Sequence, residues 1–133
     1  MAKYTYIPVD IYKRGITVFI GSHKEFKSWV RDYYKNDEDY QNLIDYVCDN
    51  DTYNTLGVFW YNGSTGDGII ELPRFPKSAK EIAVAAHEVL HAVFHILDYC
   101  GINYSKDSGG ESHTYLLEYI LSNLLNIDNY KIV

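Results

Sequence analysis

The five residues His-Glu-Val-Leu-His at positions 87–91 lie inside a helical pattern that spans residues 78–100. Two histidines four positions apart lie on one face of a helix, about 6 Å apart along its axis, so both imidazoles can reach one metal ion. A glutamate between them can hold a metal-bound water molecule and remove its proton. The stretch therefore predicts a metal site on this helix. Zinc (Zn2+) fits the pattern best, although imidazole and carboxylate groups also bind other divalent metals.

The residues around this stretch form an amphipathic pattern. At about 100° per residue, His87, His91 and Glu88 fall within one sector of the helix. Apolar residues occupy the opposite side: Ala85, Ala86, Val89, Leu90, Val93, Ile96 and Leu97. Histidines that belong to a core are expected among the apolar positions, so this separation favours a metal site over a pair of packed histidines.

A catalytic zinc ion usually has three protein ligands and one open position, so a third ligand is expected elsewhere in the chain. Gly101 is a helix stop signal, and a polar segment follows it at residues 103–110. A second helical pattern covers residues 111–125. Glu111 opens this pattern 20 residues after His91 and is the candidate for the third ligand.

With this spacing, residues 69–125, roughly half the chain, resemble the gluzincins, the thermolysin-like metallopeptidases. In that family the H-E-x-x-H motif is followed, after a loop, by a glutamate ligand on a further helix. The resemblance implies that His87, His91 and Glu111 bind zinc. It also implies that Glu88 is the general base.

One position departs from the family pattern. Tyr115 stands where the thermolysin-like enzymes have an aspartate that orients a ligand histidine. A tyrosine hydroxyl is a weaker hydrogen-bond acceptor than a carboxylate, so the orientation of the ligand is expected to differ. The chain is also similar to short H-E-x-x-H proteins encoded by phages and prophages.

Four further side chains have candidate roles near the motif. By the resemblance, His113 would stabilise a developing oxyanion. It is also a rival to Glu111 as a metal ligand, and Tyr115 is another candidate oxyanion donor. His95 is about 12 Å along the axis from the first histidine of the motif, so we expect it to line the pocket rather than bind the same ion. Glu118 is a rival third ligand two turns along the second helix.

Composition and net charge limit the number of domains and the classes of partner that the chain can have. The chain has 133 residues, of which 47% are hydrophobic and 23% charged, which predicts a single domain over residues 1–133. The net charge of −6 disfavours a nucleic-acid partner, because phosphate binding needs clustered lysine and arginine. The sequence contains no signal-like or membrane-spanning run. Without a membrane-spanning run, we expect no membrane association. The two cysteines, Cys48 and Cys100, lack metal-binding spacing, and so few cysteines without a signal favour a reduced, cytoplasmic protein.

Short β-branched or alternating runs predict strands in four places: residues 4–12, 16–20, 56–61 and 69–72. Pro8 favours an edge position for the first strand, and a glycine-rich hairpin turn joins the last two. Capping boxes at Ser22 and Ser78 predict the starts of two helices. A further helix is expected at residues 38–48, a loop at 49–55, and a tail or final strand at 126–133.

These patterns predict an α+β fold with a small, mostly antiparallel sheet, an H-E-x-x-H active-site helix and a second helix that supplies the glutamate ligand.

We expect a zinc-dependent metallopeptidase that hydrolyses a peptide bond in a peptide or protein substrate. By the resemblance, the strand at 69–72 or its partner at 56–61 binds the substrate as an added strand. One alternative is a hydrolase for a non-peptide amide. The other is a non-catalytic, metal-stabilised binding protein, such as a phage-encoded factor that holds a host protein. The oligomeric state is left open.

Overall fold

The structure is a computed structural model, and it describes residues 1–50, 56–105 and 110–133. The strands are β1 (Lys3–Val9), β2 (Arg14–Ile20), β3 (Val58–Tyr61), β4 (Gly68–Leu72) and β5 (Lys131–Ile132). The α-helices are α1 (His23–Tyr33), α2 (Gln41–Asp49), α3 (Ala79–Tyr99) and α4 (Glu111–Leu124). Short 3-10 helices occupy Asp10–Tyr12, Glu38–Tyr40 and Ile127–Asn129.

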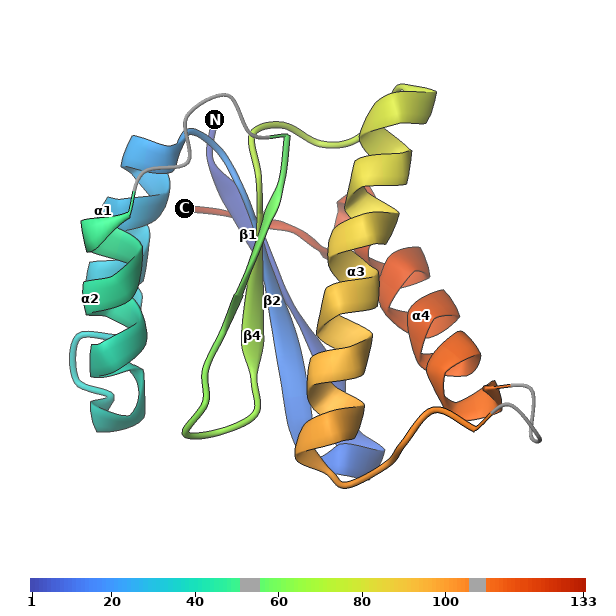
Figure 1. The fold of residues 1–133 in the computed structure, drawn as a ribbon. Coiled ribbons are helices and arrows are strands. Elements are labelled where there is room, and N and C mark those ends of the chain that lie inside the picture. Colours follow the sequence, from blue (N-terminus) through green and yellow to red (C-terminus); the bar gives the residue numbers. More distant parts are fainter. Residues whose placement is uncertain (51–55, 106–109) are drawn as a thin grey trace.

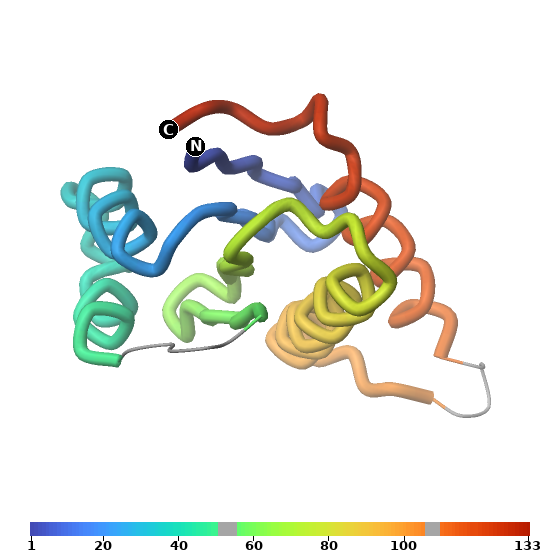
Figure 2. The backbone as a smooth tube through the Cα atoms, turned by 90° about the horizontal axis from the view of Figure 1, so that it is seen from above, coloured from blue at the N-terminus to red at the C-terminus, as the bar shows by residue number. Residues whose placement is uncertain are grey.

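The strands form one sheet in the order β3-β4-β2-β1-β5. β2 and β4 pair in parallel, and the other three pairings are antiparallel. α1 and α2 cover one face of the sheet, and α3 and α4 cover the other (Figure 1 and Figure 2). The predicted α+β class is therefore confirmed. The sheet is mixed because the β3–β4 hairpin places its second strand beside β2.

The strand β4 lies inside the sheet. Its sequence Gly-Ile-Ile-Glu-Leu is buried along its whole length, which is typical of a strand covered on both faces. β2 pairs with one side of β4 and β3 with the other. The prediction that residues 69–72 could bind an extended peptide is therefore wrong, because β4 has no free edge. Its hairpin partner β3 is an edge strand, so the alternative at residues 56–61 stays open.

The two predicted capping boxes are present. The Ser22 hydroxyl accepts a hydrogen bond from the Glu25 backbone N–H, and the Glu25 carboxylate accepts one from the Ser22 N–H. Ser78 and Glu81 make the same pair of bonds at the start of α3. These bonds satisfy backbone donors that would otherwise lack partners, so the helices begin where the sequence predicts. Gly101 ends α3 with a positive φ of 76°, as its stop signal indicated.

A core lies on each face of the sheet because side chains alternate along each strand. On β2, Ile16, Val18 and Ile20 belong to the core beneath α3 and α4. Phe19 belongs to the opposite core and packs against Phe26 and Trp29 of α1. Most of the predicted apolar face of α3 is buried: Ala85, Val89, Val93, Ile96 and Leu97. Leu90 is an exception at 43% exposed, because it lies at the margin of that face, where neither the sheet nor α4 fully covers it.

The two ends of the chain lie side by side at one edge of the sheet (Figure 2). The predicted first strand ends at Val9, because residues 10–12 form a 3-10 helix. β5 pairs with Lys3 and Tyr4 only, so Pro8 has a single neighbouring strand, β2. The predicted loops at 49–55 and 103–110 lie largely outside the described residues. No helix in the described part of the chain is both long and apolar enough to cross a membrane.

Candidate functional site

The two motif histidines converge on the exposed side of α3. The Nε2 atoms of His87 and His91 lie 3.1 Å apart, and the rings meet edge to face with centroids 4.7 Å apart. Two imidazole nitrogens that share a tetrahedral zinc ion through bonds of 2.0–2.1 Å would be separated by about 3.3 Å. The observed separation is close to that value, so the pair fits a shared metal ion without a change of helix geometry.

Glu88 lies beside this pair but points into the protein. Its Oε1 is 3.9 Å from His87 Nε2, and the residue is buried. Burial raises the pKa of Glu88, while His87, His91 and a hydrogen bond from the Phe59 backbone N–H act in the opposite direction. A carboxylate with a raised pKa is a better proton acceptor near neutral pH than an exposed one. The geometry therefore suits Glu88 to proton transfer.

Glu88 lies beside the start of the edge strand β3, because a Cβ on Gly57, the residue before that strand, would be 3.2 Å from the Glu88 Cγ. β3 is an edge strand, and α3 packs against it. Across the hairpin the Asn62 N–H donates to the Asp67 carbonyl, so the peptide groups of Asn62 and of Trp60, two residues before it, face β4. The intervening residues, Phe59 and Tyr61, direct their peptide groups to the free edge. The proton acceptor thus lies near a strand edge with which no described strand pairs.

The predicted third ligand is not brought to the histidine pair. Glu111 is the exposed first residue of α4, and the structure puts no group of three or more His, Cys, Asp or Glu side chains in a metal-binding arrangement within residues 1–50, 56–105 and 110–133. Glu118 is likewise exposed on α4. Residues 106–109, which precede α4, lie outside the described residues. The roles of Glu111 and Glu118 as ligands stay predictions.

The two oxyanion candidates have contrasting surroundings. His113 is buried between the two helices, with its ring 4.9 Å from that of Phe94 and 5.4 Å from that of Tyr104. Its Nε2 has no hydrogen-bond partner among the described residues. Tyr115, one turn after Glu111 on α4, is 67% exposed. Neither residue contacts the histidine pair in the described structure, so their catalytic roles also stay predictions.

His95 packs against the edge strand rather than beside His91. Its ring lies 5.8 Å from that of Phe59 and 5.1 Å from that of Tyr61. Burial lowers the pKa of His95, and the carboxylates of Asp67 and Asp98 only partly oppose this effect. A neutral imidazole in an aromatic surround is consistent with the predicted lining role of His95.

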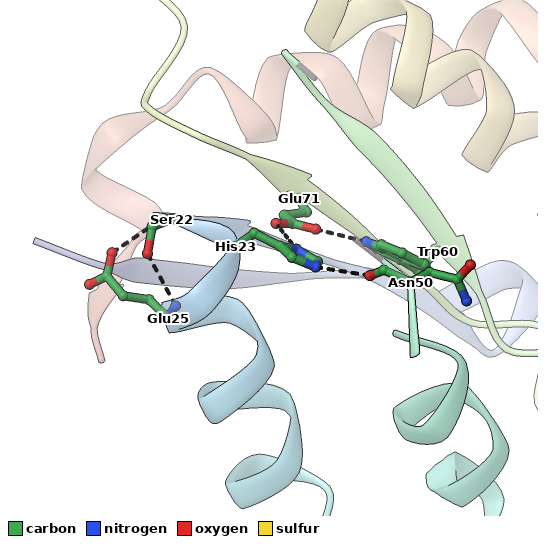
Figure 3. A network of polar contacts seen from close by, with 6 residues as sticks. All are labelled: Ser22, His23, Glu25, Asn50, Trp60 and Glu71. Atoms are coloured by element: carbon green, nitrogen blue, oxygen red, sulfur yellow. Dashed lines mark hydrogen bonds and ion pairs between the residues drawn. The ribbon is translucent and has the colours of Figure 1, made fainter. Parts of the chain in front are cut away.

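A second polar cluster, on the other face of the sheet, was not predicted from the sequence (Figure 3). Glu71 of β4 is 5% exposed, and its two carboxylate oxygens accept hydrogen bonds from His23 Nδ1 at 2.8 Å and Trp60 Nε1 at 3.0 Å. His23 Nε2 lies 3.1 Å from the Asn50 carbonyl, which can only accept, so Nε2 carries a hydrogen. A further proton is therefore shared between Nδ1 and the carboxylate. Because 48 residues separate His23 from Glu71, no local pattern could have indicated this cluster.

A groove of about 580 Å³ runs between α2 and β3. One face of α2, all four residues of β3 and the turn at residues 62–64 line it. It contains neither motif histidine, but Phe59, whose ring contacts His95 of α3, also lines it. The candidate metal centre and the groove therefore lie on opposite sides of one edge strand.

The chemistry assigned to these residues rests on their geometry. No family model, curated protein or solved structure was found to match this chain.

Proposed function

We propose that the protein is a zinc-dependent hydrolase that cleaves a peptide bond in an extended substrate. The observation that carries this proposal is the convergence of the His87 and His91 Nε2 atoms, 3.1 Å apart, beside the buried carboxylate of Glu88. Two exposed histidines so close together repel each other when both are protonated, whereas a metal ion stabilises them as neutral ligands. The arrangement is therefore better suited to metal binding than to packing.

His87 and His91 would hold the metal, and by the resemblance Glu111 would be the third protein ligand. When bound, zinc supplies Lewis acidity toward the substrate carbonyl and the attacking water. The histidines supply two neutral nitrogen donors on one rigid helix, which fixes their spacing. His113 and Glu118 are the alternatives to Glu111.

Glu88 would receive the proton from the attacking water and pass it to the leaving amine. Its burial favours this role, because a carboxylate withdrawn from water binds a proton more readily. Of the two oxyanion candidates, Tyr115 is the more accessible, since His113 is enclosed between the helices.

The free edge of β3 would bind the substrate backbone. The peptide groups of Phe59 and Tyr61 face this edge, and no described strand pairs with it. An extended segment can add to such an edge through main-chain hydrogen bonds. Because Glu88 borders the same edge, the added strand would pass next to the proton acceptor.

Zinc content and peptide hydrolysis, measured on the same preparations, test the proposal. We expect one zinc per chain in the wild type, loss of zinc in His91→Ala, and retained zinc without turnover in Glu88→Gln. Hydrolysis is followed with a quenched fluorescent peptide library. Unchanged turnover in Glu88→Gln would contradict the role of this residue as the base, and zinc binding without cleavage of any peptide would leave a metal-stabilised binding protein.

The third ligand is tested separately. Glu111→Ala should weaken zinc binding by about 10- to 1000-fold, since it removes one of three protein ligands. Glu118→Ala tests the rival ligand on the same helix in parallel. If Glu118→Ala weakens zinc binding and Glu111→Ala does not, the ligand is Glu118.

A further inference from the structure

The groove between α2 and β3 follows the free edge of the sheet. Phe59 and Tyr61 direct their side chains toward His95 on the α3 side, yet both residues also line the groove on the α2 side. The groove therefore reaches the edge strand β3 itself, which no other described strand covers. Four residues of strand span about 13 Å, enough to lie beside several residues of an extended segment.

The segment of chain that supplies all the groove-lining residues carries negative charge only. Residues 36–73 contain eight Asp or Glu residues and no Lys or Arg, and all groove-lining residues fall in this range. Two of the acidic groups are engaged: Glu71 in the His23 cluster, and Asp67 with the Gly15 N–H. Asp39, Asp45 and Asp49 are exposed, and the described residues offer them no ion pair.

These exposed carboxylates border the groove. Asn42 and Tyr46, one turn apart on α2, line it, and Asp49 lies within about 20° of Asn42 around the helix. Asp45 lies about 60° from Asn42 on the side away from Tyr46, so it is farther from the groove than Asp49. At the other end, the Asn62 side chain donates to the Asp39 carbonyl, which fixes Asp39 next to the turn that closes the groove.

The lining also presents aromatic surface. Tyr46 is 61% exposed and meets Trp60 edge to face, with ring centroids 5.9 Å apart. Aromatic faces accept the aliphatic stem of a lysine or arginine and attract its charged end. A carboxylate rim around aromatic side chains is thus complementary to a long cationic side chain and unfavourable for an anionic one.

The walls of the groove are held in place before anything binds. The Asn50 carbonyl at the end of α2 bonds to His23, His23 bonds to Glu71, and Glu71 bonds to Trp60 on the opposite wall (Figure 3). A site that is already ordered loses less conformational entropy on binding.

We propose that this groove binds an extended polypeptide segment through its Lys or Arg side chains. The backbone pairing in this proposal rests on the proposed strand addition to β3, whereas the charge recognition does not depend on hydrolysis. Along an added strand, side chains alternate between the two faces. Residues that enter the groove therefore alternate with residues that face Glu88, so the groove selects substrates with a basic residue next to the position presented to the metal centre.

The test measures binding of two labelled eight-residue peptides that alternate Thr with Lys or Thr with Glu. Fluorescence anisotropy is recorded with the zinc-loaded Glu88→Gln protein, which prevents cleavage. We expect the lysine peptide to bind at least about tenfold more tightly than the glutamate peptide at low salt, and to weaken as salt screens the charges. Equal binding of the two peptides would overturn the proposal.

Variants locate the effect. Asp45→Asn combined with Asp49→Asn should weaken binding of the lysine peptide about fivefold, the product of two exposed charge pairs. Tyr46→Ala should weaken it as well. Asp128→Asn, which removes an exposed carboxylate near the C-terminus, is the matched control and should leave binding unchanged. If the rim variant binds like the control, the groove is not the site.

The two proposals fail in different ways. Hydrolysis by the wild type with no preference for basic peptides would overturn the groove assignment and leave the hydrolase intact. Tight binding of the lysine peptide to a wild-type protein that cleaves no peptide would overturn the hydrolase proposal and leave the groove assignment intact.

Discussion

Replacing Glu71 by leucine should destabilise the protein although it removes a buried charge. The two oxygens of Glu71 accept from Trp60 Nε1 at 3.0 Å and His23 Nδ1 at 2.8 Å. Leucine is similar in size and accepts neither bond. Both donors stay in place, so the substitution leaves two polar groups without a partner rather than replacing a complete ion pair.

The size of the effect follows from how exposed each donor is. Trp60 is buried, so its orphaned N–H costs about 1–3 kcal/mol. The His23 side chain is 19% exposed and can recover part of its bonding from water, which puts its loss near the lower limit of about 1.5 kcal/mol for a bond to a charged group. Leucine gains some apolar burial in return. We expect a net loss of about 2–4 kcal/mol, or a fall in Tm of roughly 10 °C for a chain of this length.

Glu71→Gln is the matched control. Its carbonyl oxygen can accept from Trp60, and its amide can donate to Nδ1 of a neutral His23 whose Nε2–H still bonds to the Asn50 carbonyl. All three bonds persist, so the loss should stay under about 1 kcal/mol. Urea denaturation followed by circular dichroism measures both variants. A leucine variant as stable as the wild type, or a glutamine variant as unstable as leucine, would refute the hydrogen-bond reasoning.

Three further outcomes are expected. Ile96→Ala, at a fully buried position, should lose about 2–5 kcal/mol in urea denaturation, while Leu90→Ala on the same helix should lose less than about 1 kcal/mol. Hydrogen bonds from the Ser78 backbone N–H and from the Arg74 guanidinium lower the pKa of Glu81 from 4.5 to about 2. This stabilisation is present above pH 4.5 and is lost as the pH falls toward 2, so Glu81→Gln should flatten the dependence of Tm on pH in that window. Zinc at about 100 times its Kd should stabilise the wild type by about 2.7 kcal/mol but not His87→Ala, as thermal denaturation would show.

Local patterns in the sequence predicted most elements because their causes are local. The capping boxes at Ser22 and Ser78 depend on residues three positions apart, and both are present. The β-branched run at residues 16–20 in β2 predicted a buried strand, because this pattern also depends only on neighbouring residues. The convergence of the motif histidines also follows from helix spacing alone. These features need no knowledge of the tertiary fold.

Features that depend on distant segments were not predictable in this way. The pairing of His23 with Glu71 requires β4 to lie beside β2 with α1 above it. The exposure of Leu90 depends on how much of α3 its neighbour α4 covers. The sequence did hold one clue to strand order. The continuous apolar run around Glu71 is typical of an interior strand, whereas residues 58–61 end in an exposed tyrosine.

The position of β3 gives this short strand its importance for function. Trp60 turns to the α2 side, where it lines the groove and is anchored by Glu71. Its neighbour Phe59 turns to the α3 side, where its ring meets His95, and Glu88 lies beside Gly57 just before this strand. A segment added to this edge would thus present consecutive side chains to two different environments, one cationic-selective and one next to a proton acceptor. Because the hairpin puts β4 inside the sheet and leaves β3 outside, the same topology that excludes the first candidate strand makes its partner an edge strand.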